Sequence, residues 1–289
     1  VYKRQLLQIR RTGINLFGPR FKDMLIYGAP LVGSGLVMFM LNGVDRWILA
    51  DHVGNAQLAQ YAIAAKFALA ANLLIQPYVM WWMPRRFQVV KQPGGTQRAA
   101  DYAFMGVTLV ILVGFMVSSG TDLLMQLLLP DAYSQAATYV LGLVLIVVIK
   151  ETGELLNLGC FYGSHTHAQL IVNVIAALLA FAGLTMLVPI LGINGAILAL
   201  LMAQVTRLVL YMVISQRILW LPYRYMKMLQ YVLVSSLVVL VGQQLSVPWI
   251  KAAYIIPGSL VMLLSASWLG LIPTMRIPGI VIRMIPVRS

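Results

Sequence analysis

Charged residues are scarce in this 289-residue sequence: they make up 10% of it, whereas soluble globular domains carry roughly 25%. Hydrophobic residues make up 61%, and the mean hydropathy is +0.86. A water-soluble fold is therefore excluded. Cysteine is almost absent too, because Cys160 is the only one. A disulfide within the chain is excluded, and Cys160 lacks the neighbouring ligands that a thiol or metal motif requires.

The common catalytic signatures are also missing. The sequence contains no P-loop, no G-x-S-x-G, no H-E-x-x-H and no D-x-D pair that would hold a nucleotide-sugar metal. His165 and His167 stand close together without a third ligand nearby, which is more typical of loop residues than of a metal site. We therefore expect no enzyme activity, no cofactor and no metal.

Long apolar runs are what the sequence has in abundance. Each is near the twenty residues that a helix needs to cross a hydrocarbon core of about 30 Å. The sequence therefore predicts an all-α polytopic membrane protein with about eight transmembrane helices. An interrupted apolar stretch, Thr121–Tyr133, is expected to lie at the membrane interface. The predicted spans are Met24–Val44, Leu58–Met83, Tyr102–Ser118, Ala136–Leu158, Leu170–Val188, Gly195–Ser215, Leu229–Leu245 and Ala253–Ile272.

Basic residues gather in alternate loops, which indicates the orientation. Sixteen of the 21 Lys and Arg residues fall in the two ends and in one set of loops, and only Arg46 and Lys251 fall in the other set. Basic loops stay in the cytoplasm, so we expect both ends of the chain to be cytoplasmic. The net charge of +13 then reflects topology and contact with anionic membrane lipids, and no nucleic-acid partner is expected.

Several charged residues remain within the predicted spans, where charge is costly, so such residues usually face a bundle interior or a wet cavity. These candidate cavity residues are Lys66, Lys150, Glu151, Glu154 and Arg207, with Arg46 at the end of the first span. Polar residues with helical spacing accompany them on four spans, which predicts one shared hydrated cavity. They are Ser34, Asn42 and Asp45; Asn72 and Gln76; Asn157; and Gln204.

Other interpretations of these residues stay open. Lys66 could extend its side chain to an interface, Lys150 and Glu154 could form an ion pair within one helix, and Asp45 and Arg46 could lie near the periplasmic surface. Small residues repeat at four-residue spacing and predict close helix packing. They are Ala64 and Ala68; Ala176 and Ala180; and Gly195, Ala199 and Ala203.

Four segments resemble bacterial polysaccharide (Wzx-type) flippases of the multidrug/oligosaccharidyl-lipid/polysaccharide exporter superfamily. The segment YGAPLVGSGLVMFMLNGVDRWILADHVG and the following YAIAAKFALAANLL are similar to the seventh and eighth helices of that family. LLLPDAYSQAATYVLGL is similar to the entry to its tenth helix, and LVPILGINGAILALLMAQVTRLVLYMVISQRILWLPY to its eleventh and twelfth. The matching motif residues are Pro30, Asn42, Asp45, Arg46, Tyr61 and Lys66.

The resemblance implies a domain organisation. Flippases of this family have two six-helix lobes around a cationic cavity, some with two further helices. By resemblance, 1–23 is a basic cytoplasmic linker, 24–228 is the second, C-terminal lobe, and 229–289 holds two additional helices and a cytoplasmic tail. The chain starts with Val1 rather than Met. We therefore expect the N-terminal lobe, a partner of this one, to be encoded upstream.

The resemblance also implies a function. The family translocates an undecaprenyl-diphosphate-linked oligosaccharide across the bacterial inner membrane without ATP. The six charged candidates above would then line or support its cavity. Two alternatives stay open, a multidrug exporter of the same superfamily and a membrane-embedded glycan polymerase or glycosyltransferase. The latter would be expected to carry a large periplasmic loop, and none of the predicted loops is large.

Overall fold

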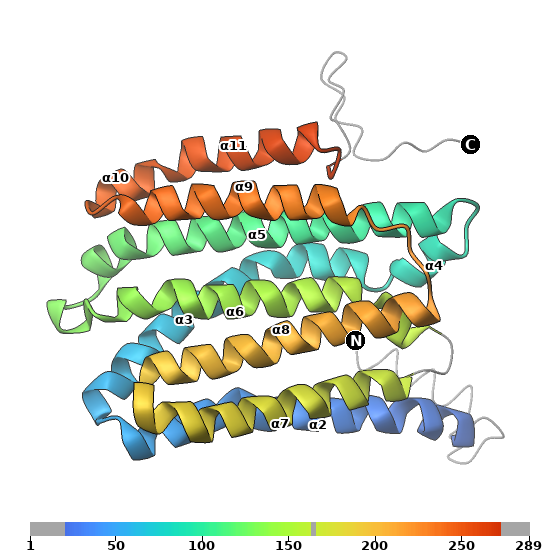
Figure 1. Ribbon diagram of the computed structural model, residues 1–289, viewed down its shortest axis with the longest axis horizontal. Coiled ribbons are helices and arrows are strands. Elements are labelled where there is room, and N and C mark those ends of the chain that lie inside the picture. Colours follow the sequence, from blue (N-terminus) through green and yellow to red (C-terminus); the bar gives the residue numbers. More distant parts are fainter. Residues whose placement is uncertain (1–20, 163–165, 273–289) are drawn as a thin grey trace, which may run out of the picture.

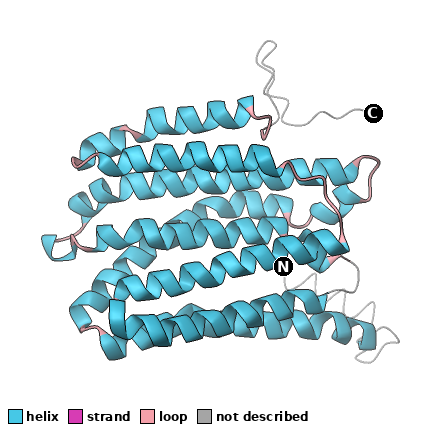
Figure 2. Cartoon of the chain, viewed as in Figure 1, coloured by secondary structure: helices cyan, strands magenta, loops and turns pink. Residues whose placement is uncertain are grey.

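The computed structural model describes residues 21–162 and 166–272, and throughout these residues it contains helices and no strands (Figures 1 and 2). Most of the predicted linker and the predicted tail therefore lie outside the described residues. The long helices run roughly along one axis (Figure 1). The helices are α2 (Phe21–His52), α3 (Asn55–Trp82), α4 (Arg86–Val90), α5 (Gly95–Leu128), η1 (Asp131–Tyr133), α6 (Ala136–Leu156), η2 (Leu158–Phe161), α7 (Thr166–Leu191), α8 (Ile193–Ile218), α9 (Tyr225–Gln244), α10 (Pro248–Ala253) and α11 (Ile255–Trp268).

The described helices have the lengths and surfaces of a membrane protein. Six candidate spans are long and apolar enough to cross a bilayer: α3, α5, α7, α8, α9 and the continuous run of α10 and α11. Their outward faces carry large apolar side chains that no other part of the described structure covers, such as Met186, Ile190 and Trp268, which are 70%, 77% and 87% exposed. Water would solvate this surface poorly, whereas lipid tails match it. The prediction of an all-α polytopic membrane protein is confirmed, and six of the eight predicted spans are among these candidates.

Two predicted segment boundaries are wrong. The first predicted span was to end at Val44, but α2 continues to His52, so Asp45 and Arg46 lie inside a helix rather than in a turn after it. The interfacial segment expected at Thr121–Tyr133 is not separate either, because α5 continues to Leu128 before Pro130. No proline or glycine occurs between Thr121 and Leu128, so the helix continues through this segment. With 34 residues at 1.5 Å each, α5 is about 51 Å long.

Small residues determine how closely α7 and α8 pack. A Cβ added at Gly183 would lie 2.9 Å from the Cβ of Ala199, and one added at Gly195 would lie 2.2 Å from the carbonyl oxygen of Leu187. The repeat of small residues on α8 therefore packs as predicted. Gly192, with a φ of +56°, makes the turn that joins the two helices.

The helix contacts form two groups around the centre of the bundle. On one side α2 packs against α7, and α7 packs against α8; on the other side α3 and α5 both pack against α6. The contact between α6 and α8 joins the two groups. Although α2 and α3 are consecutive, they contact each other little, which leaves space between the groups. The helices α9 to α11 pack along α5 on the outer side of the bundle (Figure 1).

One buried ion pair attaches α10 to the bundle. Lys251 was predicted to be a loop residue, but it is only 6% exposed. Its Nζ atom lies 2.6 Å from Asp122 Oδ2 on α5 and 3.0 Å from Gln243 Oε1 on α9. A lysine buried in this way needs such acceptors, because an unpaired ammonium group would be costly there.

Candidate functional site

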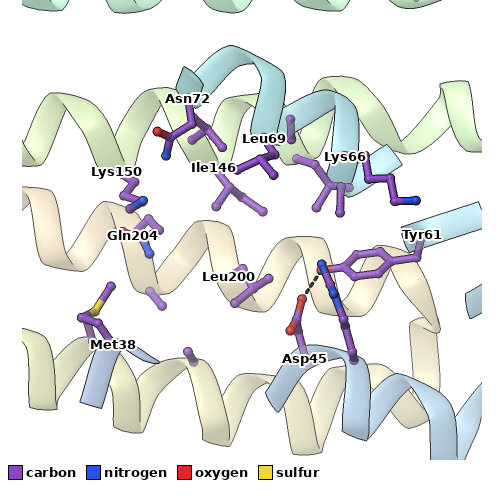
Figure 3. Close-up of a pocket in the computed structure, with 18 residues that line it drawn as sticks. Met38, Asp45, Tyr61, Lys66, Leu69, Asn72, Ile146, Lys150, Leu200 and Gln204 are labelled. Atoms are coloured by element: carbon purple, nitrogen blue, oxygen red, sulfur yellow. Dashed lines mark hydrogen bonds between the residues drawn. The ribbon is translucent and has the colours of Figure 1, made fainter. Parts of the chain in front are cut away.

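A cavity of about 360 Å³ lies between α2, α3, α6, α7 and α8 (Figure 3). Its volume falls in the range of about 300–1,000 Å³ that is usual for ligand sites. Alanine side chains from three helices leave the room for it, so the small-residue repeats serve more than packing. These are Ala65, Ala68, Ala176, Ala180 and Ala203. The polar side chains in its wall are Asp45, Arg46, Tyr61, Lys66, Asn72, Lys150 and Gln204.

Three of the predicted cations lie in the wall of this cavity. Lys150 is paired, since its Nζ atom lies 3.3 Å from Glu151 Oε1 on the same helix. Arg46 and Lys66 form no hydrogen bond or ion pair with any other residue that the structure describes. Lys66 is eleven residues from the start of α3, about 16 Å along its axis, and both it and Arg46 are exposed residues at the wall of the cavity. The cavity therefore offers two cations to an anion.

A buried carboxylate stands at one end of the same cavity. Tyr61 donates its hydroxyl proton to Asp45 Oδ2 at 2.5 Å, and Tyr61 is 1% exposed (Figure 3). The backbone places both groups well inside their helices, Tyr61 in α3 and Asp45 in α2. Asp45 is 9% exposed, and its second oxygen, Oδ1, is buried without a partner among the described residues.

Lys150 and Gln204 stand at the other end of the cavity, with Leu69, Ile146 and Leu200 between the two ends (Figure 3). Behind Lys150, Glu151 is 4% exposed and accepts a hydrogen bond of 3.2 Å from Asn72 Nδ2. Asn72 in turn accepts one from Gln76. The cavity is thus polar at both ends and apolar in the middle.

Glu154 and Arg207 are paired with each other in a separate buried network. The alternative in which Lys150 pairs with Glu154 is wrong, because α8 packs against α6 and places the Arg207 guanidinium on Glu154, while Lys150 contacts the neighbouring Glu151. Arg207 also donates to Asn173 on α7 at 2.7 Å. Asn173 donates to Ser34 on α2, and the Tyr211 hydroxyl donates to Asn173. The network therefore links α2, α6, α7 and α8.

Arg86 joins this network and was not among the predicted site residues. Sequence reasoning placed it in a basic cytoplasmic loop, but it is 5% exposed, and its Nη1 donates to Asn157 Oδ1 at 3.0 Å. Its guanidinium carbon lies 4.7 Å from the centre of the Phe161 ring. Asn157 donates in turn to Glu154 at 2.8 Å. The contacts of Arg86 with Asn157 and Phe161 join residues far apart in the sequence, so no local pattern could have indicated them.

The structure therefore divides the six candidates of the sequence analysis. Arg46, Lys66 and Lys150 line one cavity, and Glu151 lies behind Lys150. The other two, Glu154 and Arg207, belong to the buried network, and a 3.5 Å contact from Arg207 to Gln204 links this network to the cavity wall. The side chain of Asn42 lies outside the described residues.

Comparison of the chain with protein-family models, with curated proteins and with solved structures gives no match. The resemblance to polysaccharide flippases therefore stays an expectation from the sequence. The features that bear on function are the cavity, its charges and its place within a helix bundle that has a lipid-compatible surface.

Proposed function

We propose that the protein translocates an anionic lipid headgroup, a diphosphate that carries an oligosaccharide, across the bacterial inner membrane. The observation that carries this proposal is a pair of cations, Arg46 and Lys66, that have no hydrogen-bond or ion-pair partner in residues 21–162 and 166–272 and line a cavity between membrane-compatible helices. Charge inside a membrane protein is costly, and where it occurs it commonly marks a substrate or ion pathway. A diphosphate would neutralise both cations, and they would replace part of its lost hydration.

Under this proposal α2 and α6 also cross the membrane, which gives eight spans. The charged groups on α6 fit such a span because they face protein. Glu151 contacts Asn72, and Glu154 contacts Arg207. Charged side chains that point into the bundle avoid the cost of contact with lipid. Opening the cavity alternately to the two sides would then move the headgroup while its lipid chain stays in the bilayer.

The proposed orientation places the basic turns in the cytoplasm. The turn that contains α4 and the turn between α8 and α9 lie at one end of the bundle, and the α2–α3 turn lies at the opposite end (Figure 1). A cysteine in place of Lys91 should therefore be protected from a membrane-impermeant thiol reagent in intact cells, whereas one in place of Asn55 should react. Both positions are exposed. Reaction of position 91 from outside would contradict the orientation.

The native thiol does not complicate this labelling experiment. Cys160 is buried, and burial raises the pKa of its thiol to about 12. The thiol therefore stays protonated at neutral pH and reacts slowly, because the thiolate is the reactive form. The unmodified protein is expected to remain unlabelled and provides the blank.

Binding of undecaprenyl diphosphate to the complete protein in lipid nanodiscs tests the proposed function. The double variant Arg46→Met/Lys66→Met should weaken binding by about 10- to 100-fold, since each substitution removes a hydrogen bond to a charged group. Lys91→Met, which removes an exposed cation outside the cavity, should have no effect. Undiminished binding by the double variant would refute the cationic site. If that variant instead gained affinity for tetraphenylphosphonium, a lipophilic cation, a drug exporter would be favoured.

A further inference from the structure

The carboxylate of Asp45 is an unexpected member of a site for a diphosphate. It shares the cavity wall with Arg46 and Lys66, and a carboxylate repels phosphate. It is nevertheless fixed in place, because Tyr61 donates to its Oδ2 oxygen at 2.5 Å. An ionised carboxylate only accepts hydrogen bonds, so Asp45 suits a part of the ligand that donates them rather than the diphosphate.

The second oxygen of Asp45 has no hydrogen-bond partner among the residues that the structure describes. Oδ1 is buried, and the whole residue is 9% exposed. Of the buried side-chain oxygen and nitrogen atoms that have no partner in the described part of the chain, this is the one that belongs to the cavity wall. Leaving a buried acceptor without a donor costs free energy, so a bound molecule that supplies a donor there gains affinity.

The surroundings of Oδ1 favour a hydrogen-bond donor over a metal ion. Arg46 follows Asp45 directly in the sequence, and Lys66 lines the same cavity, so a cation would meet like charges there. Cations such as calcium take about six to eight oxygen ligands, and magnesium takes six. No group of three or more His, Cys, Asp or Glu side chains able to hold a metal occurs in the described residues. A donor needs only the one acceptor.

We propose that Asp45 Oδ1 accepts a hydrogen bond from a hydroxyl or amide N–H of the first sugar attached to the diphosphate, and so selects the lipid-linked sugar. This inference rests on the proposed function. Arg46 and Lys66 hold the phosphates, and the neighbouring carboxylate contacts the sugar that follows them. A hydroxyl or N–H donated to a carboxylate forms a charge-assisted hydrogen bond, which is stronger than a neutral one. Tyr61 is a positioning residue, because it acts through Asp45.

The experiment compares two probes on the complete protein in nanodiscs. One is bare undecaprenyl diphosphate, and the other is undecaprenyl diphosphate linked to glucose, galactose or N-acetylglucosamine. The wild type should bind at least one sugar-bearing lipid about tenfold more tightly than the bare one. Asp45→Leu should abolish this preference, because it removes the acceptor for the sugar. Asp45→Asn, which retains an acceptor oxygen, should keep part of the preference, and this variant also serves if Asp45→Leu fails to fold.

Three results would overturn the inference. One is an equal affinity of the wild type for bare and sugar-bearing lipids, and another is an undiminished sugar preference in Asp45→Leu. The third is a preference that requires sodium, which would identify Asp45 as a cation site. Asp51→Asn, at an exposed position on the same helix, controls for loss of one negative charge and should behave as wild type. If the wild type does not bind bare undecaprenyl diphosphate, the proposed function itself fails, which is a distinguishable outcome.

Discussion

Replacing Arg207 with methionine is expected to lower the free energy of unfolding by about 3–5 kcal/mol, because Glu154 would keep its charge without its main partner. The Arg207 side chain is 3% exposed and that of Glu154 23%, so water cannot fully replace the lost contact. Asn173 would lose a donor at the same time. Denaturant unfolding in detergent micelles, followed by circular dichroism, measures the change.

A double variant distinguishes the effect of an unpaired charge from the effect of lost side-chain packing. Arg207→Met/Glu154→Gln removes both charges together and should recover most of the stability that the single variant loses. Arg224→Met is a matched control. Arg224 forms an ion pair with Asp101 at 3.2 Å, but both side chains are about 40% exposed, so we expect a loss of about 0–1 kcal/mol. If the double variant were as unstable as Arg207→Met, the loss of stability would not come from the unpaired Glu154 carboxylate, which would contradict this prediction.

Gly159→Ala is expected to be strongly destabilising for so small a substitution. A Cβ at this position would lie 2.1 Å from the carbonyl oxygen of Ser215 and 2.8 Å from its carbonyl carbon and Cα. Those atoms are backbone, so relief requires η2 and α8 to separate. The separation would also stretch the hydrogen bond of 2.8 Å from the Gly159 N–H to Ser215 Oγ. We expect a loss of about 3 kcal/mol, at the upper end of overpacking costs, measured by the same unfolding experiment.

Gly153 provides the control for that substitution. It is buried on α6, and a Cβ there would make ordinary contacts, with Tyr211 Cδ2 at 3.5 Å as the nearest atom. Gly153→Ala should therefore be neutral or stabilising by up to about 1 kcal/mol, since alanine favours helix over glycine. Equal stability of Gly159→Ala and Gly153→Ala would show that η2 can move away from α8 without cost.

Composition and spacing were sufficient to predict the helices, because apolar runs near twenty residues have few other solutions in a membrane protein. They also identified Arg46, Lys66 and Lys150, since charge is rare in such runs. What the sequence could not show was pairing between helices. Lys150 could pair with a neighbour at i+1 or at i+4, and only the placement of Arg207 on α8 beside Glu154 decides between them.

The same limit explains why Arg86 was missed as a site residue. In the sequence it is one of a pair of arginines after a proline, a pattern typical of a cytoplasmic turn. Its burial depends on Asn157 and Phe161, which lie more than seventy residues further along the chain. Boundaries failed for a related reason. Both α2 and α5 continue past the polar residues near which the predicted spans end, Asp45 and Arg46 in α2 and Thr121 and Asp122 in α5, because no proline or glycine interrupts the residues that follow.

The divergence of α2 from α3 has a mechanical consequence. These helices are joined by a short turn yet contact each other little, while the contacts between α6 and α8 hold the two groups of helices together. The links across that seam include the Glu154–Arg207 pair and the bond from Gly159 to Ser215. Rotation of one group of helices against the other, about the contact between α6 and α8, would therefore widen the cavity between α2 and α3.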